Sequence, residues 1–541
     1  MARKGSQKVR TGCRTCKSRR VKCDETKPHC LRCTSHGRSC QGYPSQDTVN
    51  YSWGELLQKR PIMPALTHRS PSADRRALDF YFRVMAPILT EYSDDSFWIQ
   101  LVAPATEQDT AVRHAVIAIS SLYERSSLEA DTAQLDKTKK TLENHFAIGH
   151  YNHALREISK AADENTVLFV CILFVCIEVL NNNKDAAVAH SRHGVRIFNG
   201  SRSRSSLWVR ERLMSMFVRL SIFPTLFDQK SLVFPPFVDA ESNLGGMPTN
   251  LDTYRSSIDA IMTRCLRLLR TLGPRHGLSL WPEDWPLPDG VAASQQTLSS
   301  LLTKWQDNFS VFELAHPPLH HKTQVLYLIM RMKCLVGHIW MGTCTERNET
   351  SYDRYLAVFR NIVDLAAQAV VLESGRDRVH ALAKPKFVFD LGYLPILYFV
   401  ALKCRDLGTR VAALDCMAIL PAAREFLWDS ALEICIAWRV VEKEHGADRR
   451  TLGTRRDRAP RDIPIFPPPD RPRIKSARAG DTAELRANQS GERVAHYAVT
   501  FFTKAVGQYG LKTEEEWIDV CASPPHGLRK PDRKTTALSR V

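Results

Sequence analysis

Apolar residues recur at helical spacing over most of this 541-residue chain. The first stripe follows a helix start at Ser70, with Pro71 at the first helical position and Asp74 in the first turn. Its apolar side is made by Ala77, Leu78, Tyr81, Phe82 and Met85. Stripes over residues 112–122 and 147–158 predict two further helices.

The same pattern continues through the middle of the chain, where strand-like alternation is scarce. It predicts helices at 166–180, 186–198, 207–220, 255–272, 295–314, 322–341, 353–373, 387–404 and 409–418. Together these stretches predict one large all-helical domain over residues 75–445.

Other stretches lack such periodicity. Residues 1–12 are basic and predict a mobile arm, while residues 41–74 contain several prolines and no coiled-coil heptad, which is typical of a linker. Arg and Pro are so dense in residues 446–495 that we expect a disordered segment. Within residues 496–541 we expect a terminal helix from Tyr497 to Leu511 and a basic tail.

The longest apolar run, from Val167 to Ile177, is about half of the ~20 residues that cross a bilayer. It predicts a buried helix, and we expect no membrane partner. Cys171 and Cys176 lie in this run, where a free cysteine most often fills a core. The start of the chain has no secretory signal, which indicates a reducing, intracellular compartment.

Net charge is +17, and the excess lies at the two ends of the chain. Residues 1–44 hold 12 Lys and Arg against Asp24 and Glu25, and residues 446–541 hold 19 basic and 12 acidic residues. The residues between are balanced. The basic N-terminal end therefore predicts a polyanion-binding surface.

Six of the 15 cysteines fall within 28 residues. They are Cys13, Cys16, Cys23, Cys30, Cys33 and Cys40, which form two similar halves of a C-x2-C pair followed by a single cysteine. Paired cysteines at this spacing are typical zinc ligands, and a reducing compartment favours thiolates over disulfides. By contrast, His316, His320 and His321 have no suitably spaced partner and indicate a surface loop.

Two tetrahedral zinc ions need eight thiolate ligands, so six cysteines suffice only if two of them bridge both metals. The repeat places the bridges at Cys13 and Cys30. One zinc would be held by Cys13, Cys16, Cys23 and Cys30, and the other by Cys13, Cys30, Cys33 and Cys40. Because the segment has few apolar residues, we expect the metal to supply most of its folding energy.

Four cations lie between Cys16 and Cys23, on what we expect to be a short helix that the cysteines fix on one side. They are Lys17, Arg19, Arg20 and Lys22. Lys and Arg neutralise phosphates, and Arg can make a bidentate contact to guanine in the major groove. The run therefore predicts a surface that binds double-stranded DNA.

Over residues 13–40 the motif resembles the fungal zinc binuclear cluster transcription factors, which share this cysteine spacing, the basic run and a proline in the central loop, here Pro28. The resemblance implies bridging by Cys13 and Cys30, base contacts from Arg19 and Arg20, and a preference for CGG-like triplets. Lys17 and Lys22 are then expected to face phosphates.

A looser resemblance covers segments such as RALDFYFRVMAPIL and LGYLPILYFVALKCRDLGTRVAAL, which look like the helical regulatory domain of filamentous-fungal members. The expected fold is thus a small two-zinc module with two short helices, followed by a large all-α domain.

The resulting hypothesis is a nuclear regulator of RNA polymerase II genes, with DNA and the transcription machinery as partners and a homodimer as the alternative to a monomer. Two other functions stay open: a zinc-storage or metal-sensing protein, and an enzyme with a zinc targeting module. The chain contains no Gly-rich phosphate loop, nucleophile elbow or H-E-x-x-H motif, so no catalytic residue is predicted.

Overall fold

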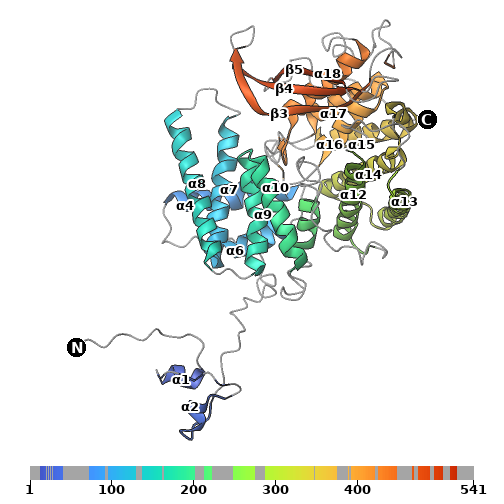
Figure 1. Ribbon diagram of the computed structural model, residues 1–541. Helices are drawn as coiled ribbons and strands as arrows, with labels where there is room; N and C mark the ends of the chain where they lie inside the picture. The colour runs from blue at the N-terminus through green and yellow to red at the C-terminus, as the bar shows by residue number, and fades with distance from the viewer. Residues whose placement is uncertain are drawn as a thin grey trace. The chain divides into compact units, whose positions relative to one another are not determined.

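A computed structural model divides the chain into two units, Met1–Arg60 and Pro61–Val541 (Figure 1). It describes residues 13–19, 21, 23–24, 26, 29–40, 72–91, 96–129, 137–160, 164–200, 213–221, 248–273, 287–346, 348–374, 388, 392–420, 424–446, 466–467, 473–487, 493–503 and 512–520. The predicted arm (1–12), the tail beyond 520 and most of the linker lie outside these residues.

The first unit contains the two predicted short helices, α1 (Arg14–Ser18) and α2 (Leu31–Thr34). In the second unit the first described helix, α4 (Ser72–Phe80), agrees with the helix start predicted at Ser70 and includes the last three residues assigned to the linker. A π-helical turn, η1 (Tyr81–Met85), carries α4 into α5 (Ala86–Glu91), so the first predicted stripe is helical throughout.

The next helices form the first part of the second unit. They are η2 (Ser96–Leu101), α6 (Val102–Gln108), α7 (Thr110–Glu129), α8 (Lys137–Ser159), α9 (Glu164–Leu180) and α10 (Lys184–Gly200). Asp109 starts α7, because its Oδ1 accepts the N–H groups of Ala111 and Val112 at 2.8 and 3.0 Å.

The apolar helix α9 packs against α7 and α10 (Figure 1). From Leu168 to Leu180 every residue except Cys171 is buried, which explains why apolar side chains surround this helix on all sides. Cys176 is buried and Cys171 half-buried, as core residues.

The later helices share one large apolar core. They are α12 (Leu251–Gly273), α13 (Val291–Ala315), α14 (His321–Thr343), η5 (Glu349–Tyr355), α15 (Leu356–Ser374), α16 (Tyr393–Lys403), α17 (Leu407–Ile419) and α18 (Ser430–His445). Helices α13 and α14 approach closely at Gly337, where an added Cβ would lie 2.8 Å from Leu302. Helix α18 was not among the predicted helices, and residues 207–212 lie outside the described part of the chain.

Three antiparallel strands follow α18, where the sequence predicts disorder and a terminal helix. They are β3 (Ile474–Ala487), β4 (Arg493–Thr503) and β5 (Lys512–Val520), in the order β3-β4-β5. The helix predicted at 497–511 is therefore wrong over 497–503, and the disorder predicted up to 495 is wrong over 474–487. Most of residues 446–472 lies outside the described residues.

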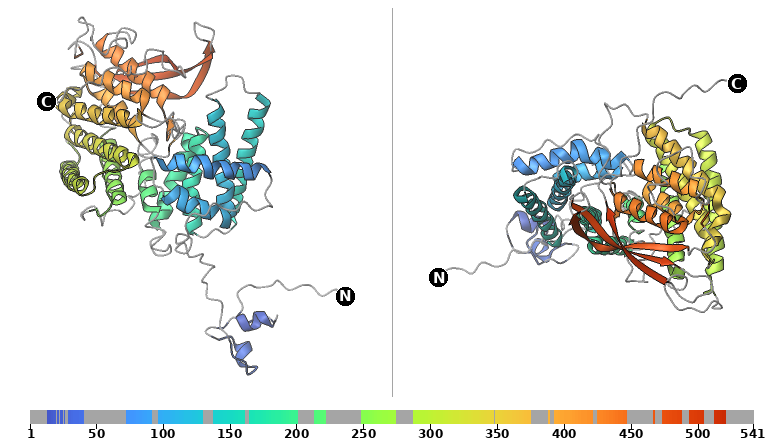
Figure 2. Two further views of the ribbon diagram at one scale, coloured as in Figure 1. Left: turned by 180° about the vertical axis from the view of Figure 1, so that it is seen from behind. Right: turned by 90° about the horizontal axis from the view of Figure 1, so that it is seen from above.

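These predictions are wrong because tertiary contacts determine the structure of residues 474–503. Backbone pairing with β4 holds the Arg-rich β3 along its length, with a bulge between Ala479 and Ala483. The sheet packs on α18 and adds Ile474, Val499, Phe501 and Ile518 to the core (Figure 2). A two-residue hairpin, β1 (Arg424–Glu425) and β2 (Trp428–Asp429), precedes α18, and Glu425 bridges to Val388.

Two helical segments of the described chain, His321–Thr343 and Glu349–Glu373, are long and apolar enough to cross a membrane. Both contribute to the core of the second unit, as buried helices commonly do. His316 and His320 are exposed at the α13–α14 connection, and His321 begins α14.

Candidate metal centre

The two halves of the cysteine repeat fold in the same way. Cys30 caps α2, and its Sγ accepts the N–H of Cys33 at 3.3 Å. In the first half, Cys13 Sγ accepts the N–H of Cys16 at the same distance. Each half is completed by its third cysteine, since Cys23 Sγ accepts the N–H of Cys13 and Cys40 Sγ that of Cys30, both at 3.4 Å.

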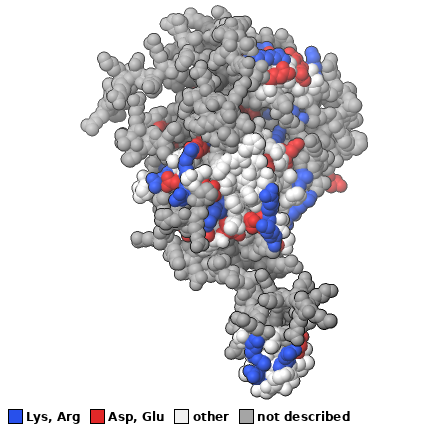
Figure 3. All heavy atoms as spheres, turned by 90° about the vertical axis from the view of Figure 1, so that its left-hand side faces the viewer, with Lys and Arg blue, Asp and Glu red and all other residues white. Residues whose placement is uncertain are grey.

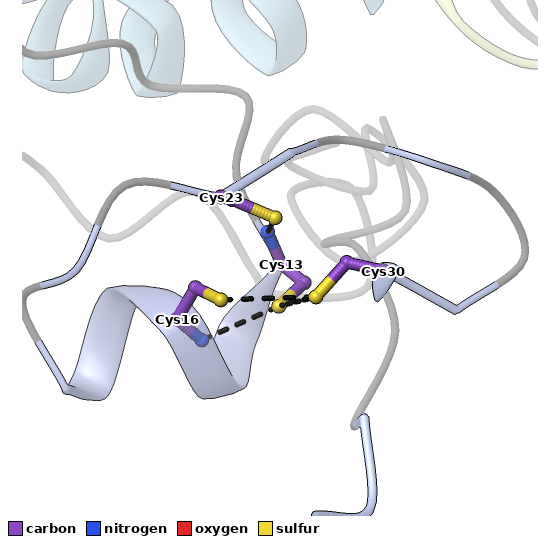
Figure 4. A group of neighbouring side chains, drawn as sticks. All are labelled: Cys13, Cys16, Cys23 and Cys30. Carbon is purple, nitrogen blue, oxygen red and sulfur yellow. Dashed lines mark hydrogen bonds between the residues drawn. The ribbon is translucent and has the colours of Figure 1, made fainter. Parts of the chain in front are cut away.

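Four of the cysteine side chains, those of Cys13, Cys16, Cys23 and Cys30, converge beside α1 (Figure 4). Cys13 Sγ lies 3.5 Å from Cys30 Sγ and 3.8 Å from Cys33 Sγ, while Cys16 Sγ lies 3.7 Å from Cys30 Sγ. A tetrahedron with Zn–S bonds of about 2.3 Å has S–S edges of about 3.8 Å. The spacing of these sulfurs therefore fits tetrahedral zinc.

The Sγ atoms form two groups of four, and the atoms of each group all lie within 4.8 Å of one another. They are Cys13, Cys16, Cys23 and Cys30, and Cys13, Cys30, Cys33 and Cys40. Cys13 and Cys30 belong to both groups, so the structure brings the six predicted ligands together in the arrangement expected of a bridged cluster.

Burial disfavours the thiolate form of these cysteines unless a cation lies beside them. Cys13, Cys16, Cys30 and Cys33 are fully buried. Burial raises the pKa of Cys13 to about 12 and also raises the pKa values of Cys16 and Cys30. A divalent metal would supply the positive charge that offsets this cost, because metal coordination favours the thiolate.

Two polar contacts that the sequence analysis missed brace the module. Asp24 Oδ2 accepts the Leu31 N–H at 2.8 Å and the Thr26 hydroxyl at 2.6 Å, and the bond from Thr26 lowers the pKa of Asp24. Thr15 donates to the carbonyl of Ser39 at 3.4 Å, which links the two halves. The D-x-T pattern after Cys23 is the only signal that pointed to the first contact, since Asp and Thr commonly close turns on backbone N–H groups.

The basic run is described only in part. Lys17 lies in α1 and Arg19 follows its end, where the Arg19 N–H reaches the carbonyl of Thr15. The helix expected across the run is shorter than predicted, because α1 ends at Ser18. Arg20, Lys22 and Pro28 lie outside the described residues. Basic side chains are visible on the described surface of this module (Figure 3), and the described ones are those of Arg19, Arg32 and Arg38.

Residues 11–49 match the fungal Zn(2)-Cys(6) binuclear cluster domain, and residues 76–388 match the fungal specific transcription factor domain. The aspercryptin biosynthesis cluster-specific transcription regulator atnN of Emericella nidulans is 24% identical, over 81% of this chain and 88% of that protein.

Two further relatives match shorter stretches. The transcription regulator lscL of Purpureocillium lilacinum is 29% identical over 35% of this chain and 49% of its own length. The transcriptional regulatory protein moc3 of Schizosaccharomyces pombe is 59% identical over 50 residues, 9% of this chain and 10% of its own. No solved structure matches the chain. Since the two family matches together cover the cysteine module and more than half of the chain, the protein belongs to the fungal Zn(2)-Cys(6) transcription factors, DNA-binding regulators that carry two zinc ions and are not enzymes.

Proposed function

We propose that this chain regulates transcription by RNA polymerase II by reading GC-rich, CGG-like DNA elements through residues 13–40. The observation that supports this most is the pair of four-cysteine groups sharing Cys13 and Cys30, with the basic run beside them. Membership of the family implies a nuclear function. The alternatives of a zinc store and of an enzyme are set aside, because both family matches are transcription factor domains.

We assign one zinc to Cys13, Cys16, Cys23 and Cys30 and the other to Cys13, Cys30, Cys33 and Cys40. When bound, zinc supplies the positive charge that keeps the thiolates deprotonated and cross-links the two halves. The backbone N–H groups of Cys16 and Cys33 donate to the bridging sulfurs and so offset part of their charge. The cluster thereby sets the direction of α1.

The basic run divides its work between reading DNA and holding it. We assign base contacts to Arg20 and its neighbour Arg19, because a guanidinium can bond a guanine through two N–H groups. Lys17 and Lys22 are assigned to phosphates, where they add affinity without sequence preference. Residues 75–445, extended by β3, β4 and β5, form the regulatory domain in this proposal, with the transcription machinery as its partner.

The test is selection of bound sites from random double-stranded DNA by the full chain, followed by binding curves at several salt concentrations. We expect CGG-like triplets, and their occurrence singly or in pairs separates a monomer from a homodimer. Arg20→Ala should remove most of the preference for the selected triplet, worth about 1–3 kcal/mol, while nonspecific binding remains. Lys22→Ala should weaken matched and scrambled DNA alike and lower the salt slope by about one.

Arg32→Ala is the matched control, because Arg32 is an exposed arginine of the same module outside the basic run. It should leave the triplet preference unchanged. Selection without any enriched sequence, or Arg20→Ala weakening matched and scrambled sites equally, would contradict the proposal.

A further inference from the structure

Helix α8 is anchored in an unusual way. It packs on α7, yet its buried apolar side chains in the described part are only Ala147 and Ala154. Two larger apolar residues of α8, Ile148 and Leu155, are exposed, at 46% and 37%. Phe146, Tyr151 and Ile158 are half-buried and add further apolar contact, so in the described part the polar contacts of α8 act beside a modest apolar interface.

The central polar contact joins two histidines. His114 Nδ1 of α7 lies 2.8 Å from His150 Nδ1 of α8. On its other side His150 Nε2 lies 3.5 Å from Asp74 Oδ1 of α4. Three helices, α4, α7 and α8, therefore meet at one imidazole pair, where α4 crosses the α7–α8 pair (Figure 2).

A hydrogen bond between two Nδ1 atoms needs one N–H and one lone pair. The first added proton can be accommodated: a charged His150 donates its Nδ1–H to His114 and directs its Nε2–H toward Asp74. A second proton has no such place. It would sit on His114 Nδ1, facing another N–H across 2.8 Å, with both rings positively charged.

The surrounding charges do not remove this conflict. Asp74 is the acidic group from α4, and Arg113 on α7 adds a positive charge. On α8, His153 stacks on His114 with ring centroids 5.1 Å apart, and Glu157 is paired with Lys160 at 2.7 Å. One carboxylate, Asp74, directly faces the pair.

We propose that His114, His150 and Asp74 form a proton-operated clasp, which fastens α8 to α7 while at most one imidazole is charged and loosens α8 when both are. Nothing in the DNA-binding role requires this clasp. It would make the regulatory domain respond to acidification by changing the surface around α8.

The direction of the pH effect follows from the same geometry. Burial, with the neighbouring histidines, lowers the pKa of His114 and of His150 below the ordinary value. The unfolded or loosened helix then takes up protons more readily than the closed one. The stabilisation is complete above the ordinary histidine pKa, about 6.5, and is lost as the pH falls below it.

Another polar contact of α8 provides a contrast. The Tyr151 hydroxyl donates to Glu178 Oε1 at 2.7 Å and lies 3.0 Å from His190 Nε2. A charged His190 can donate to the tyrosine oxygen beside a buried carboxylate, so protonation there meets an acceptor. Burial lowers the pKa of His190 as well, so the contrast between the two contacts is geometric: only the His114–His150 pair brings two N–H groups face to face when both rings are charged.

Hydrogen exchange of the full chain, read by mass spectrometry and corrected for intrinsic exchange, tests the clasp. Peptides covering residues 145–159 should lose about tenfold in protection between pH 7.5 and pH 5.5, while peptides of α9 change little. His114→Asn and His150→Asn, which keep a polar group but cannot be charged, should each reduce the loss to less than about twofold. His145→Asn, at an exposed position on the same helix, should keep the tenfold loss.

A second measurement does not depend on how well the variants protect α8. With 13Cε1-labelled histidine, NMR should show the His114 pKa rising toward the ordinary value in His150→Asn, and staying low in His145→Asn. Three results would overturn the clasp: unchanged α8 protection in the wild type at pH 5.5, equal losses in the wild type and in both asparagine variants, or a His114 pKa that His150→Asn does not move.

Discussion

The two units of this chain are stabilised by different means. In Met1–Arg60 the buried residues among those described are cysteines, with Val21 and Cys23 packed against them. In Pro61–Val541 a large apolar core extends from α12 to the strands after α18. A segment of 28 residues cannot bury enough apolar surface to offset the conformational entropy of folding, whereas the second unit can.

The difference concerns polar groups as well. In the first unit the buried sulfurs face one another, an arrangement that a bound cation stabilises. In the second unit buried charges carry their own counter-charges, as Arg410 Nη1 does with Glu444 Oε2 at 2.7 Å. The first unit therefore depends on an external ligand, and the second depends on the completeness of its own packing.

The largest effect should come from Cys13→Ala. Cys13 belongs to both sulfur groups, so its loss removes a ligand from each tetrahedron. Structural zinc in small modules is worth about 10–16 kcal/mol, so the module should unfold and native mass spectrometry should show both zinc ions lost. The helical circular dichroism of the second unit should persist.

Cys435→Ala is the control, because Cys435 is half-buried in α18 outside the cluster, and this variant should retain two zinc ions. Two zinc ions bound by Cys13→Ala would contradict the bridged arrangement. A collapse of the helical signal in Cys13→Ala would show that the second unit also depends on zinc for its fold.

A smaller effect, of about 3–5 kcal/mol, is expected from Glu444→Gln. Burial alone would raise the pKa of Glu444, but Arg410 and Arg405 outweigh burial and hold it below the ordinary value. Glu444 Oε1 also accepts the N–H of Ile474 at 2.7 Å, which ties β3 to α18. The neutral variant leaves two buried arginines with less counter-charge, so urea denaturation should show a less stable second unit.

Glu442→Gln is the matched control for that variant. Glu442 pairs with Arg439 at 3.0 Å near the surface, and such pairs contribute about 0–1 kcal/mol. In both variants the zinc count should stay at two. Equal losses of stability from the two substitutions would show that the burial of Glu444 does not determine the size of the loss.

The smallest effect concerns the start of α7. Asp109→Ala removes the acceptor of two backbone N–H groups and should cost about 1 kcal/mol of the second unit's stability. Asp109→Asn keeps an oxygen acceptor and should cost much less. A urea titration followed at 222 nm checks both, and equal costs would show that the carboxylate's charge, not its hydrogen bonds, starts α7.

Prediction from the sequence succeeded where the determining contacts are local. The helices α7 and α14 follow from apolar periodicity over a few turns, and α9 follows from its continuous apolar run. The sulfur arrangement follows from the spacing of Cys13, Cys30 and their neighbours along 28 residues. The strand β4 was mistaken for a helix because its run RVAHYAVTFFT shows no clean alternation, and only its pairing with β3 and β5 makes it a strand.

The sequence by itself determined the zinc module and the helical character of the second unit, since metal-ligand spacing and helical periodicity act between residues close in the chain. Only the tertiary structure decided that residues 474–520 form a sheet on α18, that Glu444 faces Arg410 and β3, and that His114 meets His150. The contacts of Glu444 and of His114 join residues 30 or more positions apart, and single-sequence patterns hold no information about which distant segments pack together.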